Sequence, residues 1–129
     1  EPCACGRRGC LEAYCGTNAI QRLAGRPVTP KALADAANAG DAAAQGVWNE
    51  VGTRLGEGLA NLVLAYDPGA VFLLGGVARA GALLLDPVKR VLSAQPFRRP
   101  FERLSLLAPA ERDWGALGAA LLAIEGARR

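Results

Sequence analysis

Large apolar residues recur along the middle of the chain with the spacing of a helix. From Trp48 to Tyr66 they follow one another at steps of three and four residues, so one face of a long helix is expected to be buried. Asp41 is the expected cap at its start, and the turn over residues 67–69 is expected to end it. The predicted buried stripe is Trp48, Val51, Leu55, Leu59, Leu62 and Tyr66.

Cap residues and helix breakers predict shorter helices on both sides of this one. Thr29 stands before a proline, and Asp86 stands before Pro87, so each pair places an N-cap ahead of a proline at the first helical position. Asp113 is the expected cap of the last helix. The expected helical ranges are 11–24, 30–40, 87–93 and 114–125.

Two apolar runs are too short for such helices and are typical of strands. The run AVFLLGG, Ala70–Gly76, has no polar residue before its glycines, as in a parallel strand covered on both faces, and LSLLA, Leu104–Ala108, is the second run. A helix is expected between them, and parallel strands need such a crossover. Because two strands are too few for a complete sheet of this kind, further strands are expected before Glu1.

Composition and charge exclude several classes of protein. The 129 residues are 51% hydrophobic and 21% charged, which is typical of one globular domain and not of a disordered chain. The apolar runs are far shorter than the roughly 20 residues that span a bilayer, and no signal peptide opens the chain, so we expect a cytoplasmic protein without a membrane partner. A net charge of +3 is weak for a nucleic-acid binder. The chain has no initiating Met and is expected to begin partway through a larger protein.

Three cysteines in the stretch CACGRRGC predict a metal site. Cys3 and Cys5 are too close for an unstrained mutual disulfide, and four cysteines in the chain are too few for a disulfide-stapled domain. Gly6 and Gly9 permit the tight reversals that would aim several sulfurs at one point, and thiolates are preferred ligands of structural zinc. We therefore expect Cys3, Cys5 and Cys10 to bind zinc.

The fourth ligand of such a zinc site is open on the sequence alone. A closed structural site has four protein ligands, and the chain contains no histidine. Cys15 is the remaining cysteine, but it follows a helix start at Leu11 and need not face the loop. Either Cys15 completes the site or the ligand lies outside this chain.

Glycines mark two further positions of interest. Gly75 and Gly76 end the first predicted strand, where ligands of parallel sheets bind and where a missing Cβ lets an anionic group approach the backbone. The alternative is that the two glycines only form a turn after the strand and bind no ligand. Gly52, Gly56 and Ala60 share one face of the long helix, which indicates either close approach of another helix or subunit, or simple tolerance of glycine.

These features together resemble the ROK family of bacterial sugar kinases and sugar-responsive repressors. The stretch CACGRRGCLEAY, Cys3–Tyr14, resembles its zinc-binding signature. The segment Leu59–Leu92 is similar to its succession of long helix, Asp-Pro turn, buried strand, glycine turn and helix, and Gly115–Ala123 is similar to its C-terminal helix. One departure is Leu74-Gly75-Gly76, where the family often has three glycines. The resemblance implies an α/β, ribonuclease-H-like fold of the actin and hexokinase type. Residues 1–129 would be the C-terminal part of the second domain, with residues 1–12 as the zinc loop and 13–129 as helices with two strands.

The resemblance also implies roles for individual residues. In the family, structural zinc is held by cysteines that match Cys3, Cys5 and Cys10 and by a histidine of a Gly-His pair upstream of them, and a glutamate that matches Glu12 hydrogen-bonds sugar hydroxyls. Gly75 and Gly76 would contact the nucleotide. The whole protein would use ATP and Mg²⁺ to phosphorylate a hexose or N-acetylhexosamine and would form a homo-oligomer. The catalytic base would lie upstream, so this chain alone is expected to be inactive.

Two other classes of function fit the same residues. A ROK repressor carries the cysteine motif, binds sugar as an effector and binds DNA through a helix-turn-helix that would precede Glu1. A free-standing zinc module would be favoured only if this chain were complete and Cys15 were a true fourth ligand.

Overall fold

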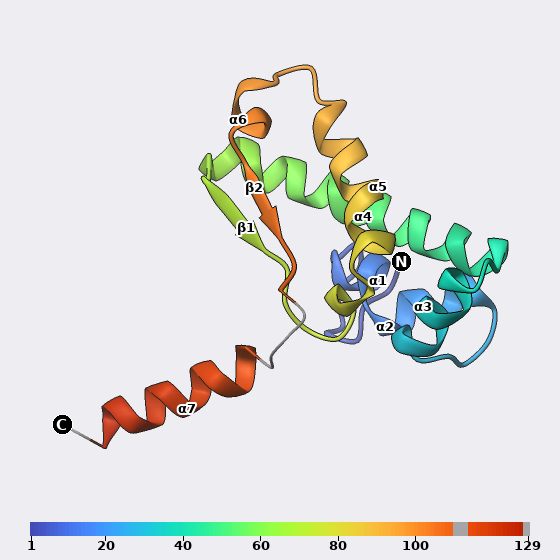
Figure 1. Ribbon diagram of the computed structural model, residues 1–129, viewed down its shortest axis with the longest axis horizontal. Coiled ribbons are helices and arrows are strands. Elements are labelled where there is room, and N and C mark those ends of the chain that lie inside the picture. Colours follow the sequence, from blue (N-terminus) through green and yellow to red (C-terminus); the bar gives the residue numbers. More distant parts are fainter. Residues whose placement is uncertain (110–113, 128–129) are drawn as a thin grey trace.

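The computed structural model describes residues 1–109 and 114–127, and it is mostly helical with two short strands (Figure 1). Asp113, the expected cap of the last helix, lies outside these residues. None of the helices formed by these residues combines the length and the hydropathy that a bilayer span requires. The elements are α1 Glu12–Cys15, α2 Thr17–Ala24, α3 Pro30–Asn38, α4 Ala42–Tyr66, β1 Ala70–Phe72, the 3₁₀ helix η1 Ala78–Ala80, α5 Ala82–Ser93, α6 Arg99–Glu102, β2 Ser105–Leu107 and α7 Trp114–Gly126.

The long helix α4 is the centre of the fold and begins and ends where the sequence predicts. The Asp41 carboxylate accepts hydrogen bonds from the amides of Ala43 and Ala44, and Asp67 ends the helix in the left-handed conformation. Helices α1 to α3 pack against one end of α4, and α5 runs beside it toward the strands (Figure 1). One core cluster lies at each end of α4, centred on Trp48 and on Leu59.

Close contact between α4 and α5 explains the glycines on the face of α4. A Cβ added at Gly52 would lie 2.4 Å from Cγ of Pro87, and one added at Gly56 would lie 2.8 Å from Cβ of Val91. Real Cβ atoms do not approach that closely, so the two glycines admit α5. Of the two explanations left open by the sequence, close approach is therefore correct, and the approaching helix belongs to the same chain.

The predicted start of a helix at Asp86 and Pro87 is wrong. Helix α5 already begins at Ala82, behind Gly81 with φ 59°, and it runs through Pro87 to Ser93. A proline inside a helix loses one backbone hydrogen bond. Here Pro87 is buried against Gly52, so packing between the two helices offsets that loss.

Two further expectations for the helices need correction. The helix expected over residues 11–24 is interrupted at Gly16, whose ψ of 177° is extended and separates α1 from α2. The expected buried stripe does not continue to the end of α4. Leu62 and Tyr66 are 47% and 76% exposed, whereas Val63 is fully buried. Val63 lies one helical turn after Leu59, on the face of α4 that packs in the second core cluster with residues of α5 and the two strands.

The strands β1 and β2 pair in parallel, as predicted, with Val71 opposite Leu106. One face of the pair packs on the second core cluster through Val71 and Leu106. The other face is uncovered in the described chain, where Phe72 and Leu107 are 59% and 44% exposed. Helix α7 extends away from the rest of the fold, and no residue of it is buried (Figure 1). The expectation of strands covered on both faces is therefore met on one face only.

Candidate functional site

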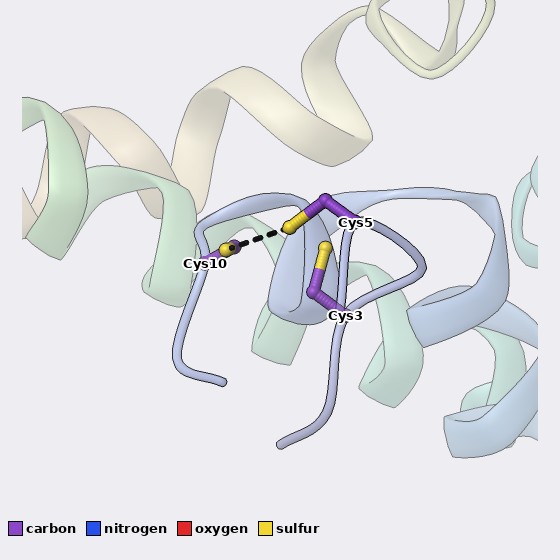
Figure 2. Close-up of side chains that lie close together, drawn as sticks. All are labelled: Cys3, Cys5 and Cys10. Atoms are coloured by element: carbon purple, nitrogen blue, oxygen red, sulfur yellow. Dashed lines mark hydrogen bonds between the residues drawn. The ribbon is translucent and has the colours of Figure 1, made fainter. Parts of the chain in front are cut away.

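The cysteine loop is folded so that three sulfurs converge. The amide of Cys3 donates to the carbonyl of Arg7 at 2.8 Å, and Gly6 and Gly9 have φ of +85° and +77°, a region that glycine adopts readily. The Sγ atoms of Cys3, Cys5 and Cys10 all lie within 4.8 Å of one another, and those of Cys5 and Cys10 are 3.6 Å apart (Figure 2). The two predicted glycine reversals are confirmed.

The spacing of these sulfurs fits a zinc ion. Tetrahedral coordination with Zn–S bonds of about 2.3 Å separates two sulfurs by about 3.8 Å. Hydrogen bonds with the Arg7 backbone and with the Cys3 and Cys10 thiols lower the pKa of Cys5, whereas hydrogen bonds with Cys5 and Cys3 raise the pKa of Cys10 to about 11. Without metal, Cys5 is therefore expected to lose its proton at a lower pH than Cys10. A bound zinc ion would supply the positive charge that stabilises several thiolates at once.

Cys15 does not join this cluster. It is half-buried against α4, and its thiol donates to the carbonyl of Val51 at 3.8 Å. Burial, followed by the negative charge of Glu12, raises the pKa of Cys15 to about 11, so the thiol stays protonated at neutral pH. Of the two fourth ligands that the sequence leaves open, Cys15 therefore does not lie beside the three sulfurs.

The loop is joined directly to the helix that carries Glu12. The carbonyl of Cys10 accepts a hydrogen bond from the amide of Ala13 at 2.9 Å, so the third cysteine also begins the first turn of α1. Leu11 packs on α4 where a Cβ at Gly58 would lie 2.8 Å from Cδ1 of Leu11. The cysteine loop and α4 therefore fix the position of α1 from two sides.

The missing side chain at Gly16 leaves space for the Glu12 carboxylate. A Cβ added at Gly16 would lie 2.0 Å from Oε1 of Glu12, so the Glu12 side chain lies directly over Gly16. Within residues 1–109 and 114–127, the Glu12 carboxylate has neither a hydrogen bond nor an ion pair. It is therefore free to accept hydrogen bonds from a ligand.

The glycine turn after β1 has room on its outer side. Gly75 has φ of +100°, which other residues rarely adopt, whereas Gly76 has no such constraint. A Cβ added at Gly76 would meet no atom within 4 Å. The backbone at Gly76 is therefore open to a ligand, as the sequence predicts for the end of a parallel strand.

One hollow brings Glu12 and Gly76 together. This Glu12 hollow has a volume of about 460 Å³ and lies between α1, the end of β1 and α4, with Leu11, Glu12, Gly16, Leu55 and Gly76 in its wall. Glu12 and Gly76 are 64 positions apart in the sequence, and only the fold places them at one site. Sequence reasoning missed Gly16, because the reason for a glycine there is a side chain that folds back over it.

The chain is similar to known proteins over almost its whole length. Residues 1–126 match the ROK family. The chain is 32% identical to a glucokinase of Halalkalibacterium halodurans, with 91% of this chain and 41% of that protein covered. It is 36% identical to an N-acetylmannosamine kinase of Yersinia pestis, with 94% and 42% covered. The chain thus spans about two fifths of the length of these relatives.

A solved structure shows the same fold. The crystal structure of a ROK family glucokinase from Streptomyces griseus, in complex with glucose and AMPPNP, matches with a TM-score of 0.70 and 28% identity over 82% of this chain and 41% of that one. The predicted fold class, an α/β fold of the actin and hexokinase type with two parallel strands in this chain, is confirmed.

Proposed function

Since the chain belongs to the ROK family, we propose that residues 1–129 are the C-terminal part of the second domain of an ATP-dependent sugar kinase. Residues 1–12 form its zinc loop, and the rest contributes one wall of the active site. The observation that carries this proposal is the Glu12 hollow, because a carboxylate without a partner and an open glycine turn meet there. A kinase needs both features within one cavity, one for the acceptor sugar and one for the phosphoryl donor.

In this proposal each residue of the site binds or positions a substrate. Glu12 accepts hydrogen bonds from two neighbouring hydroxyls of a hexose or N-acetylhexosamine, since a carboxylate has several acceptor positions. The open backbone at Gly76 lets the phosphates approach. ATP would supply the phosphoryl group and Mg²⁺ would neutralise its charge. Zinc, held by Cys3, Cys5 and Cys10 with a fourth ligand from outside, would fix the loop that presents Glu12 and take no part in the chemistry.

The catalytic base of the proposed reaction lies outside this chain. Among the described residues, Glu12 is the one acidic side chain in the wall of the Glu12 hollow, and it is assigned to the sugar. Transfer to a hydroxyl requires a base beside the acceptor, and such a base commonly contributes two or more orders of magnitude in rate. The chain by itself is therefore expected to phosphorylate no sugar.

Replacing Glu12 separates the two halves of the proposed site. In the complete protein, Glu12→Ala is expected to weaken sugar binding about a hundredfold and to change ATP binding by less than about twofold, because a charged acceptor with two hydrogen bonds is lost. Gly76→Val is expected to do the opposite, since its side chain fills the space meant for the phosphates. Calorimetric titration with glucose, N-acetylglucosamine and N-acetylmannosamine, and separately with ATP and Mg²⁺, measures both affinities. Equal losses of sugar and ATP affinity in Glu12→Ala would contradict the assignment.

Gly16→Ala is a matched variant, because it keeps the glutamate at position 12 but should move its carboxylate. The φ of −79° at Gly16 suits alanine, but the added Cβ would lie 2.0 Å from Oε1 and 2.8 Å from the backbone carbonyl oxygen of Glu12, so the carboxylate must move and α1 must shift slightly. We therefore expect Gly16→Ala to weaken sugar binding about tenfold, in the direction of Glu12→Ala. Gly46→Ala, where a Cβ meets no atom within 4 Å, is the control and should bind sugar normally.

The repressor alternative makes a different prediction in a coupled kinase assay. A repressor would bind the sugar through Glu12 and show no ATP turnover, whereas the proposed kinase phosphorylates the sugar that it binds.

A homo-oligomer also stays a prediction. The uncovered face of the strands with Phe72, and the exposed helix α7, support it because apolar surface of this kind normally pairs with other protein.

A further inference from the structure

The stretch PFRRPF, Pro96–Phe101, contributes Arg98 and Phe101 to the wall of a hollow that the proposed function does not use. This α6 hollow lies between α5, α6 and β2, on the side of the fold away from α2 and α3 (Figure 1). Its volume is about 400 Å³, within the range of about 300–1,000 Å³ that small-molecule sites occupy. None of the described residues in its wall also lines the Glu12 hollow, so the two hollows are separate.

One part of the wall of the α6 hollow is apolar and belongs to the core. Leu92 of α5 is 6% exposed and is a buried member of the core cluster centred on Leu59. Phe101, Leu104 and Leu106 are partly buried and pack against the same cluster. Because the cluster holds these side chains in place, the wall offers a ligand an apolar surface of defined shape.

The short helix α6 adds two opposite charges to this wall. The carbonyl of Arg98 accepts hydrogen bonds from the amides of Phe101 at 2.9 Å and Glu102 at 3.1 Å, so Arg98 and Glu102 are one helical turn apart. Side chains at this spacing commonly form an ion pair, as Lys31 and Asp35 do in α3 at 2.6 Å. In the described part of the chain, neither the Arg98 guanidinium nor the Glu102 carboxylate has a partner. Both charges are therefore available to a ligand.

Helix α5 adds a second cation and a hydroxyl on the other side of the hollow. Lys89 and Ser93 are four positions apart, so they lie on the same face of α5 as Leu92. The Lys89 ammonium group forms no hydrogen bond or ion pair with any described residue. The Ser93 hydroxyl donates to the carbonyl of Arg90 at 3.1 Å, and its oxygen can still accept a hydrogen bond. The wall thus combines two cations, a carboxylate and a hydroxyl acceptor around an apolar surface.

Another hollow beside α5 does not offer this combination. It lies between α3, α4 and α5 and has a volume of about 540 Å³. Arg90 is the one cation among the described residues in its wall, and its guanidinium already donates to Oδ1 of Asn49. The side-chain amide of Gln45, in the same wall, donates to the carbonyl of Ala37 at 3.0 Å. A ligand with an apolar body and two opposite charges is therefore matched by the α6 hollow.

We propose that the α6 hollow binds an α-amino acid with an apolar side chain. The ligand carboxylate pairs with Arg98 and Lys89, and the ligand ammonium group donates to Glu102 and to the oxygen of Ser93. The apolar side chain of the ligand lies on Leu92, Leu104 and Leu106. This inference goes beyond the proposed kinase function and is independent of it, because it uses no residue of the Glu12 hollow.

The first part of the test compares three small molecules by calorimetric titration of the complete protein. L-phenylalanine carries both charges and an apolar body, L-serine lacks the apolar body, and 3-phenylpropionate lacks the ammonium group. The wild-type protein is expected to bind phenylalanine at least about tenfold more tightly than serine, because serine leaves the apolar surface uncovered. It is expected to bind phenylalanine about tenfold more tightly than 3-phenylpropionate, because the hydrogen bonds of a charged group are lost.

The second part of the test changes one charge of the wall at a time. Arg98→Gln is expected to lower the affinities for phenylalanine and 3-phenylpropionate about tenfold each, because both molecules have the carboxylate. Glu102→Gln is expected to lower the affinity for phenylalanine about tenfold and not to lower that for 3-phenylpropionate. Arg99→Gln is the matched control, since Arg99 is exposed and adjacent to Arg98 but does not lie in the wall.

Three outcomes would overturn the inference. If the wild-type protein does not bind phenylalanine, the α6 hollow is not an amino-acid site. If Arg98→Gln and Arg99→Gln lower the affinity equally, the ligand does not bind in this hollow. If Glu102→Gln keeps the full affinity for phenylalanine, the hollow takes an organic anion and the role of the ammonium group is wrong. Each of these results leaves the kinase proposal as it stands, because sugar and ATP affinities are measured separately.

Discussion

Serine in place of Cys3, Cys5 or Cys10 is expected to lower the zinc affinity of the complete protein by more than about a hundredfold, while Cys15→Ser changes it by less than about twofold. Loss of residues that merely orient zinc ligands costs about 10- to 100-fold, so loss of a ligand costs more. The three Sγ atoms lie within 4.8 Å of one another. Cys15 instead donates to Val51 and has a pKa raised to about 11, which disfavours the thiolate that zinc needs.

Competition with a chromophoric chelator measures these affinities, and the zinc content of the purified protein gives an independent readout. The Cys15→Ser variant is the matched control because it makes the same chemical change in the same chain. A collapse of zinc affinity in Cys15→Ser together with a small effect of Cys3→Ser would show that the ligands are assigned wrongly. Zinc loss should also weaken sugar binding, since the carbonyl of Cys10 begins the turn that carries Glu12.

Gly52→Ala is expected to destabilise the fold by about 2 kcal/mol, and Gly52→Val by more than about 3 kcal/mol, because overpacking in a filled interface costs about 1–3 kcal/mol and occasionally more. The added Cβ would lie 2.4 Å from Cγ of Pro87 and 2.7 Å from the carbonyl oxygen of Leu84. The second of these is a backbone atom of α5, so the helices must move apart. This cost exceeds the gain of about 1 kcal/mol that alanine brings to a helix.

Gly46→Ala is the matched control for this prediction, because it makes the same substitution on the same helix. Gly46 lies in α4 with nothing within 4 Å of an added Cβ, so the variant should stabilise the protein by up to about 1 kcal/mol. Urea unfolding of both variants gives the difference in the free energy of unfolding. Similar stability of Gly52→Ala and Gly46→Ala would mean that α5 does not pack on Gly52.

The contact between α4 and α5 also bears on the proposed site. Helix α5 follows η1 after one residue, Gly81, and η1 begins two residues after Gly76. Helix α4 supplies Gly58, on which Leu11 packs just before Glu12. A shift of α5 on α4 would therefore move the nucleotide side of the proposed site relative to the sugar side.

Local sequence determined those features that depend on neighbours along the chain. Asp41 caps α4, and Thr29 caps α3 by accepting from the amide of Ala32, because a side-chain oxygen satisfies an amide two or three residues on. Gly6 and Gly9 reverse the cysteine loop as predicted. The crossover helix between two apolar runs predicted a parallel pair, and the cysteine motif pointed to the family.

Tertiary structure decided whatever depends on residues far apart in the sequence. Pro87 lies inside α5 because Gly52 of another helix receives it, and its local pattern with Asp86 predicted a helix start instead. Gly16 divides the first helix, and the Glu12 carboxylate occupies the space above it. Patterns along the chain encode short-range hydrogen bonds and the period of burial, but which surfaces meet depends on packing across the fold. For that reason the sequence could name Glu12 and Gly76 separately, and the fold alone brought them to one hollow.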